Sequence, residues 1–155
     1  MANPRIDIPH PKRRGEWAEL RFMSRAAEFG LSVAKPWGES APYDFAVEHS
    51  GHFLRVQVKC TRSRRWNSYR CSVAASGGPY VAQQLDFIAA YVIPADTWYI
   101  IPAALIVGKQ DILLSPHREK SKFGRFKEAW HLLRASSETC PWQDECRQRH
   151  SGGSE

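Results

Sequence analysis

The spacing of apolar positions predicts one long helix near the start of this 155-residue chain. Trp17, Leu20 and Ala27 recur at helical spacing, with further alanines between them. Gly30 follows this pattern at a position where helices commonly end. We therefore expect a helix over residues 13–29.

Alternating patterns predict a β-hairpin after a proline- and glycine-containing loop at residues 36–42. Two runs in which apolar and polar residues alternate, at 43–49 and 52–60, are divided by a glycine-containing turn. Because strand side chains alternate between faces, Gln57 and Lys59 share the polar face of the second run.

The remaining pattern predicts further strands and a closing helix. The expected strands cover residues 69–75, 86–93, 97–101 and 112–114, and an amphipathic helix is expected over 123–135. The run at 86–93 is almost continuously apolar, as in a strand covered on both faces. This order of elements predicts an α/β domain built on a mixed sheet.

Composition and length agree with one globular domain. Hydrophobic residues make up 43% and charged residues 25%, close to soluble averages, which excludes wholesale disorder. We expect an N-terminal arm at residues 1–11, a domain at 12–135 and a polar, disordered tail at 136–155. Apolar runs are far shorter than the roughly 18–20 residues that cross a bilayer, and no signal peptide is visible. A cytoplasmic protein with no membrane partner is expected.

The chain has an excess of basic residues, with 22 Lys plus Arg against 16 Asp plus Glu. The net charge of +6 favours polyanionic partners. Basic residues cluster at 12–14, 59–65 and 118–127, and the middle cluster is followed by Trp66 and Tyr69. Mixed cations and aromatic rings are typical of nucleic-acid surfaces, although solvated faces would have the same composition. The candidate phosphate contacts are Lys12, Arg13, Arg14, Arg62, Arg64 and Arg65.

Four cysteines are too few for a disulfide scaffold in a chain of this length. Cys60 and Cys71 fall in predicted strands and are expected to be small buried residues. Cys140, Cys146 and His150 lack the tight pair and the fourth ligand of a usual zinc site, so metal binding there is disfavoured.

Four polar residues are placed so that they could converge. Glu19 lies on the predicted first helix, Asp44 opens the first strand, and Gln57 and Lys59 share a face of the second. A carboxylate beside a side-chain oxygen suits a hard cation such as Mg²⁺. A lysine beside metal-bound water stabilises charge on a phosphoryl group. The pattern is therefore suited to phosphodiester hydrolysis.

These residues also carry a resemblance to a known family. Pro42-Tyr43-Asp44 followed by Gln57-Val58-Lys59 resembles the signature of the PD-(D/E)XK nuclease superfamily. Gly15-Glu-Trp-Ala-Glu19 is similar to the front helix of Holliday-junction resolvases. The closest resemblance is to the branch with a Gln-X-Lys motif, which includes group I intron homing endonucleases. It extends over residues 12–135, including the segments that begin at Arg55, Asp86 and Asp96.

The resemblance implies a restriction-endonuclease-like fold, a mixed sheet flanked by helices, and a Mg²⁺-dependent DNA endonuclease in which Mn²⁺ can substitute. The products would carry a 5′-phosphate and a 3′-hydroxyl. Asp44, Gln57, the backbone carbonyl of Val58 and Glu19 would hold the metal, and Lys59 would position the attacking water.

Gln57 departs from the usual pattern, because most relatives have a carboxylate at that position. The missing charge should weaken metal binding, so the alternative is an inactive nucleic-acid-binding module on the same fold. Glu39, in the loop before Asp44, could compensate, whereas Glu48 at the far end of the strand is expected to be a surface residue.

The resemblance also suggests partners. DNA is the expected partner and the nucleoid the expected location, with RNA or branched DNA left open as substrates. One site per domain implies a homo-oligomer, a dimer or tetramer, if both strands are cut. Intron mobility, repair, restriction and defence all remain open as biological roles.

Overall fold

The computed structural model describes residues 5–134. Among these residues there is one α-helix, α1 (Pro11–Glu28), and it begins with a proline, whose missing N–H costs nothing in a first turn. The helix ends where Gly30 adopts a φ of 73°, and the Leu31 N–H then bonds to the Ala26 carbonyl at 3.0 Å. The predicted helix is confirmed, and it starts two residues earlier than expected, within the segment assigned to the arm.

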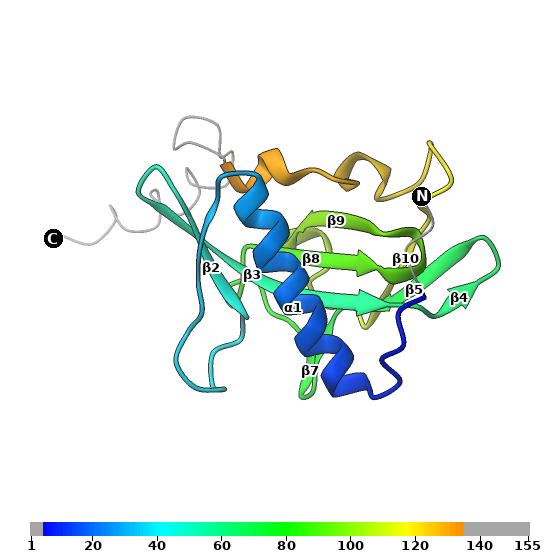
Figure 1. Ribbon diagram of the computed structural model, residues 1–155, viewed down its shortest axis with the longest axis horizontal. Coiled ribbons are helices and arrows are strands. Elements are labelled where there is room, and N and C mark those ends of the chain that lie inside the picture. Colours follow the sequence, from blue (N-terminus) through cyan, green and yellow to red (C-terminus); the bar gives the residue numbers. More distant parts are fainter. Residues whose placement is uncertain (1–4, 135–155) are drawn as a thin grey trace, which may run out of the picture.

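The main sheet has five strands, and α1 crosses one of its faces (Figure 1). In spatial order the strands are β1 (Ser32–Ala34), β2 (Phe45–His49), β3 (His52–Thr61), β8 (Phe87–Val92) and β9 (Thr97–Pro102). Neighbours run antiparallel except β3 and β8, which are parallel. The predicted hairpin, the two later strands and the mixed sheet are confirmed, and β1 is an additional edge strand.

The strand predicted at residues 69–75 is split and belongs to other sheets. Three short strands form a second sheet in the order β10 (Asp111–Leu114), β5 (Ser68–Ser72), β4 (Arg64–Arg65). The strand is interrupted at Val73, whose N–H donates to the Gln110 carbonyl. A separate pair follows, made of β6 (Ala74–Ala75) and β7 (Gly78–Pro79).

Short 3₁₀ helices complete the described chain. They are η1 (Ile93–Ala95), η2 (Ala103–Leu105), η3 (Gly124–Phe126) and η4 (Trp130–Arg134).

The amphipathic helix predicted over residues 123–135 is wrong, because η3 and η4 are separate turns. Between them, Lys127 forms a bridge with Tyr99 of β9, and Glu128 adopts a φ of 51°. The Glu128 N–H donates to the Trp98 carbonyl, and its carboxylate accepts both the Trp98 N–H and the Trp130 indole N–H, each at 2.8 Å. These bonds to the edge of the sheet replace the bonds of a continuous helix.

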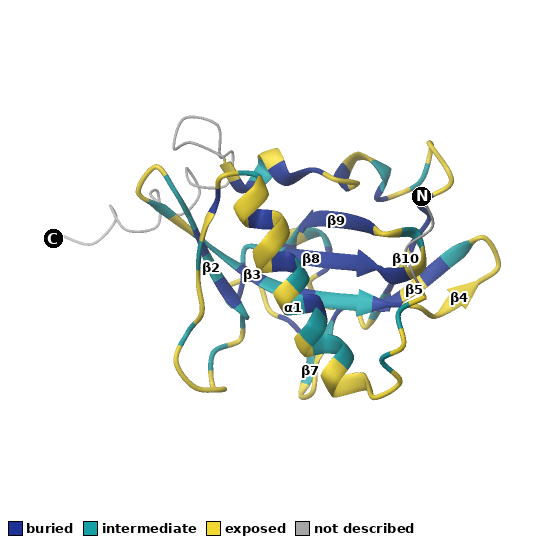
Figure 2. Ribbon diagram, viewed as in Figure 1, coloured by how far each residue is buried: buried dark blue, intermediate teal, exposed yellow. Residues whose placement is uncertain are grey.

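Two hydrophobic cores cover the two faces of the main sheet. On one face, Phe22 of α1 packs against Phe45, Trp98 and Trp130, with ring centroids 5.4–5.8 Å apart. On the other face, the second sheet and the later loops bury alternate residues of β8 and β9. Strand β8 is therefore buried along most of its length, as its apolar sequence predicts (Figure 2).

Cys71 is fully buried, as predicted, whereas Cys60 is only half-buried. Cys140, Cys146, His150 and the predicted tail at 136–155 lie outside the described residues. Within residues 5–134, no helix is long and apolar enough to span a membrane.

Candidate active site

Asp44 directly precedes β2, beside the middle of β3. The register that pairs Phe45 with Val56 sets Asp44 across from Gln57. The Asp44 N–H donates to the Val56 carbonyl at 3.0 Å, and Asp44 Oδ2 accepts the Val58 N–H at 2.8 Å. The hairpin thus brings Asp44 and Gln57 together, and a main-chain donor fixes the orientation of the carboxylate.

The Asp44 carboxylate is held at an electrostatic cost. Its pKa is raised, chiefly by burial and further by the nearby charge of Glu19. The Val58 N–H lowers this pKa, as do the smaller effects of the Lys59 and Lys35 charges, but together they do not cancel the effect of burial. A bound cation beside Asp44 would offset both the cost of burying its charge and its repulsion from Glu19.

Glu19 reaches the same site from α1. A groove of about 320 Å³ runs between α1 and the loop that leads into β2. Its lining includes Glu19, Asp44, Lys12, Lys35 and Glu39. The Glu19 side chain is 23% exposed, and its Oε2 accepts a hydrogen bond from Lys35 Nζ at 2.5 Å. Glu19 therefore has a protein cation as its partner in this structure.

Lys59 lies on the same face of β3 as Gln57, and its side chain is positioned by the short β6–β7 strand pair. Its ammonium donates to the Ala74 carbonyl of β6 at 3.0 Å and lies 5.6 Å from the centroid of the Tyr80 ring. Burial, and to a smaller extent the charge of Asp44, raises the pKa of Tyr80 to about 12. Tyr80 is thus a neutral, buried wall beside Lys59.

The oxygen atoms at this site suit a hard divalent cation. The N–H and C=O of one strand residue point to the same side, so the Val58 carbonyl opens toward Asp44, as its N–H does. The Asp44, Glu19, Gln57 and Val58 groups are all oxygen donors, the type that Mg²⁺ prefers. Of these residues, Asp44 and Glu19 line the groove, whereas Gln57 and Val58 are brought beside Asp44 by the hairpin. Within residues 5–134, no three His, Cys, Asp or Glu side chains are arranged so that they could hold a metal ion by themselves.

The predicted phosphate contacts lie in three places, with Arg13 separate from them. Lys12 lines the groove that contains Asp44, whereas Arg14 and Arg62 line a separate groove of about 650 Å³ beside β5. Arg14 is tied back to the N-terminal segment through the Ile8 and Pro9 carbonyls, at 3.0 and 3.1 Å. Arg13 is exposed on the first turn of α1.

The other two predicted contacts lie in the β4–β5 hairpin, which projects from the body of the molecule (Figure 1). The Arg64 Nε donates to the Trp66 carbonyl at 3.0 Å, and Arg65 lies over the Trp66 ring at 5.1 Å. Trp66 is itself 79% exposed. The hairpin therefore presents cations and an aromatic ring together at the surface.

Sequence reasoning missed Lys35 and Tyr80, although both contact proposed site residues. A lysine in the loop just before Asp44 was the available signal for Lys35. Glu39 lines the groove, as its place in that loop allowed. Glu48 instead accepts the Gly51 N–H in the hairpin turn at 2.6 Å, as expected of a surface residue.

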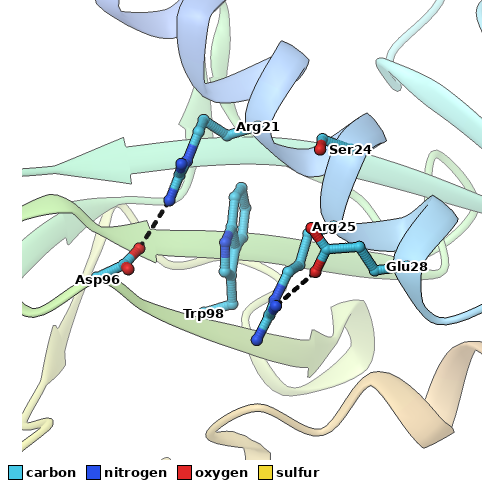
Figure 3. Close-up of a pocket in the computed structure, with 6 residues that line it drawn as sticks. All are labelled: Arg21, Ser24, Arg25, Glu28, Asp96 and Trp98. Carbon is cyan, nitrogen blue, oxygen red and sulfur yellow. Dashed lines mark hydrogen bonds and ion pairs between the residues drawn. The ribbon is translucent and has the colours of Figure 1, made fainter. Parts of the chain in front are cut away.

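A different hollow lies between the C-terminal half of α1 and β9 (Figure 3). Its volume is about 280 Å³, and its charged residues are paired, Arg21 with Asp96 at 2.9 Å and Arg25 with Glu28 at 2.6 Å. Because these charges neutralise one another, this hollow offers less to a charged ligand than the groove at Asp44.

A family comparison agrees with this geometry. Residues 9–133 match the model of the PD-(D/E)XK endonuclease family. The chain belongs to this family. The match covers α1, the whole main sheet and both strands of the Asp44–Lys59 hairpin, so this PD-(D/E)XK endonuclease has the fold and the class that its motifs suggest.

Two solved structures are similar to this PD-(D/E)XK endonuclease, one of them over nearly the full length of both chains. The bacterial homing endonuclease I-Ssp6803I is similar over 93% of this chain and 99% of its own, with 26% identity and a TM-score of 0.70. Hjc, a Holliday junction resolvase from the archaeal hyperthermophile Archaeoglobus fulgidus, matches 66% of this chain and 84% of its own, with 12% identity and a TM-score of 0.45. A search of curated proteins gave no match.

Proposed function

We propose that this protein is a divalent-metal-dependent DNA endonuclease that uses Mg²⁺, or Mn²⁺ in its place, and leaves a 5′-phosphate and a 3′-hydroxyl. The observation that carries the proposal is the Asp44 carboxylate, oriented by the Val58 N–H in a groove that also contains Glu19. The similarity to I-Ssp6803I, a homing endonuclease, over nearly the full length of both chains supports DNA as the substrate.

Asp44 and Glu19 are the proposed charged metal ligands, and Gln57 and the Val58 carbonyl the neutral ones. A bound divalent ion would supply Lewis acidity and a water of lowered pKa. The Val58 N–H occupies Oδ2 of Asp44, which leaves Oδ1 as the proposed ligand atom. Burial keeps competing water away from this carboxylate and strengthens its attraction for a cation.

Lys59 is the proposed catalytic cation. Its ammonium has three donors, and one of them is used on the Ala74 carbonyl at 3.0 Å. The remaining two can hold the attacking water and an oxygen of the scissile phosphate. The positive charge would then stabilise the negative charge that develops on the phosphoryl group during attack.

The proposed DNA surface consists of the basic residues described above. Lys12 lies in the catalytic groove, and the groove of Arg14 and Arg62 leads toward the β4–β5 hairpin that carries Arg64 and Arg65. Neutralised phosphates release counterions, so we expect binding to weaken steeply as salt is added.

Cleavage of supercoiled, linear, single-stranded and four-way-junction DNA tests this function. Wild type should cut at least one of these in Mg²⁺ or Mn²⁺ and none in EDTA. Lys59→Ala should lose about 100-fold or more, as expected for removal of one preorganised charge-stabilising group. Lys127→Ala is the matched control, because Lys127 also donates to a backbone carbonyl, that of Pro116 at 2.8 Å, away from the groove.

One observation favours a second candidate, an inactive DNA-binding module. Gln57 replaces a carboxylate, and in residues 5–134 no three His, Cys, Asp or Glu side chains are arranged so that they could hold a metal ion by themselves. Under this alternative, wild type would bind DNA equally well in EDTA and Mg²⁺ and would cut none of the substrates. Metal-dependent cleavage that Lys59→Ala removes would exclude it.

We also propose that the enzyme acts as a homo-oligomer, a dimer or tetramer. The described chain carries one candidate site, so cutting both strands of a duplex requires a second copy or a second binding event. Sedimentation velocity on the DNA complex should show at least two protein chains, and a complex with one chain that still cuts both strands would contradict the proposal.

A further inference from the structure

Trp37 stands out among the tryptophans at residues 5–134. Its side chain is 100% exposed, the highest value among the large hydrophobic residues. Trp17, Trp66, Trp98 and Trp130 each contact an aromatic ring or an arginine, whereas Trp37 has no such contact within the described residues. In that position the Trp37 ring does not stabilise the fold through the hydrophobic effect, because it buries no apolar surface.

The loop that carries Trp37 is fixed to the rim of the catalytic groove. Pro36 and Gly38, on either side of Trp37, both line the groove that contains Asp44. Gly38 has a φ of 78°, a conformation that other residues adopt only at a cost, so it sets the turn that holds Trp37 outward. Lys35 anchors the loop through Glu19 and lies 5.6 Å from the Phe45 ring.

Charge in this groove opposes a nucleic-acid backbone. Its lining includes four carboxylates, Glu16, Glu19, Glu39 and Asp44, against two cations, Lys12 and Lys35. The rim of this groove therefore attracts phosphates less strongly than the basic surfaces elsewhere do, and Lys12 and Lys35 are the cations in its lining. An uncharged contact, such as stacking of a nucleobase on an aromatic ring, does not depend on that balance.

We propose that Trp37 stacks on an unpaired or extruded nucleobase next to the scissile bond and so positions the strand at Asp44 and Lys59. This inference rests on the proposed function and adds a strand-positioning residue to it. The contact is independent of base identity, because every base offers a flat π face. It is also independent of the metal, which allows it to be measured by binding alone.

The test is equilibrium binding in EDTA to the DNA that wild type cuts best. Trp37→Ala should bind about tenfold more weakly, corresponding to about 1.4 kcal/mol, and Trp37→Phe should lie between the two. Because stacking releases no counterions, the slope of log affinity against log salt should stay at the wild-type value. Phe53→Ala is the matched control, because Phe53 is also an exposed aromatic residue (65%) but lies near the β2–β3 turn and does not line the groove. This variant should bind DNA as wild type does.

A second substrate identifies the contact as stacking. The second substrate is the same DNA with abasic sites on either side of the mapped cleavage position. Wild type should bind it more weakly than intact DNA, whereas Trp37→Ala should bind the two DNAs with equal affinity. Equal weakening of both proteins would overturn the inference, as would a Trp37→Ala variant that binds intact DNA as wild type does. Wild type that neither cuts nor binds any of the DNAs would overturn the proposed function itself, an outcome distinct from both.

Discussion

Two aspartates occupy corresponding positions on either side of β3 and illustrate different uses of the same side chain. Asp44 directly precedes β2 and Asp86 directly precedes β8. Each carboxylate accepts a backbone N–H of β3, from Val58 at 2.8 Å and from Arg55 at 2.7 Å respectively. Local structure alone would therefore assign both to capping the ends of strands.

Their charged neighbours differ. Asp86 also accepts the Arg55 guanidinium, through Nε at 3.1 Å and Nη2 at 3.2 Å, so its charge is matched within the fold. Asp44 instead faces Glu19, and burial raises its pKa. A carboxylate neutralised by the protein serves the fold, whereas one kept buried beside a like charge is available to a ligand. The comparison therefore assigns stability to Asp86 and chemistry to Asp44.

Asp44→Asn should separate the two uses most strongly. The amide oxygen can still accept the Val58 N–H, but the charge is lost, so we expect cleavage to fall by about 100-fold or more. Stability at pH 7 should rise, because a buried charge has been removed. Cleavage rates and urea denaturation measure the two effects, and a variant that is both active and less stable would contradict this assignment.

The pH dependence of that stability gain has a fixed sign. The pKa of Asp44 is raised in the folded state, so the folded protein holds the proton more tightly than the unfolded chain does. Stability from this group is therefore lost as the pH rises from the unfolded value of 3.8 through the folded value. The difference in unfolding free energy between Asp44→Asn and wild type should be smallest below that window and constant above it.

Asp86→Asn should have the opposite pair of effects. It weakens the bonds to Arg55, and because both side chains are about one-third exposed (37% and 32%), we expect a loss of about 1–2 kcal/mol in unfolding free energy. Cleavage per folded molecule should remain at the wild-type level. Loss of activity at full folding would show that Asp86 has a part in the chemistry.

Gln57→Glu should increase the unneutralised negative charge beside Asp44. A third carboxylate would strengthen attraction for a divalent ion, and we expect about tenfold tighter Mn²⁺ binding, equal to about 1.4 kcal/mol. Without metal, the added repulsion should lower stability. Calorimetric titration with Mn²⁺ measures the first effect, and exposed Gln110→Glu serves as the control for the added charge.

Lys35→Met should have the smallest effect. It releases Glu19 from the 2.5 Å ion pair, so a divalent ion no longer competes with the ammonium, and we expect Mn²⁺ to bind a few-fold more tightly. Lys35→Arg keeps a cation beside Glu19 and should remain close to wild type. Weaker Mn²⁺ binding by Lys35→Met would show that the lysine supports the site rather than competing for it.

Local pattern predicted what depends on neighbours in sequence. Helix α1, the β2–β3 hairpin and the apolar strand β8 followed from periodicity and turn residues. The false helix at 123–135 failed because Glu128 bonds to Trp98, a contact that no local pattern encodes. The segment 69–75 likewise divided between sheets, because its partners come from distant parts of the chain.

The candidate site was predictable to the same extent. Motif spacing brought together Asp44, Gln57 and Lys59, since they belong to one hairpin. Lys35 and Tyr80 were missed because the tertiary fold, not sequence distance, brings them to Glu19 and Lys59. Asp44 and Asp86 also look alike in sequence, and only their neighbours in space distinguish them.

The parallel pairing of β3 with β8 has a consequence for the order of events during synthesis. All four proposed side-chain groups of the site precede residue 60, but β3 acquires its second neighbour only when residues 87–92 have been made. A nascent chain that ends before β8 has an unpaired edge on β3 and lacks the buried core beneath it. We therefore expect the catalytic residues to emerge from the ribosome before the strand that completes their site. Nuclease activity should appear only late in translation.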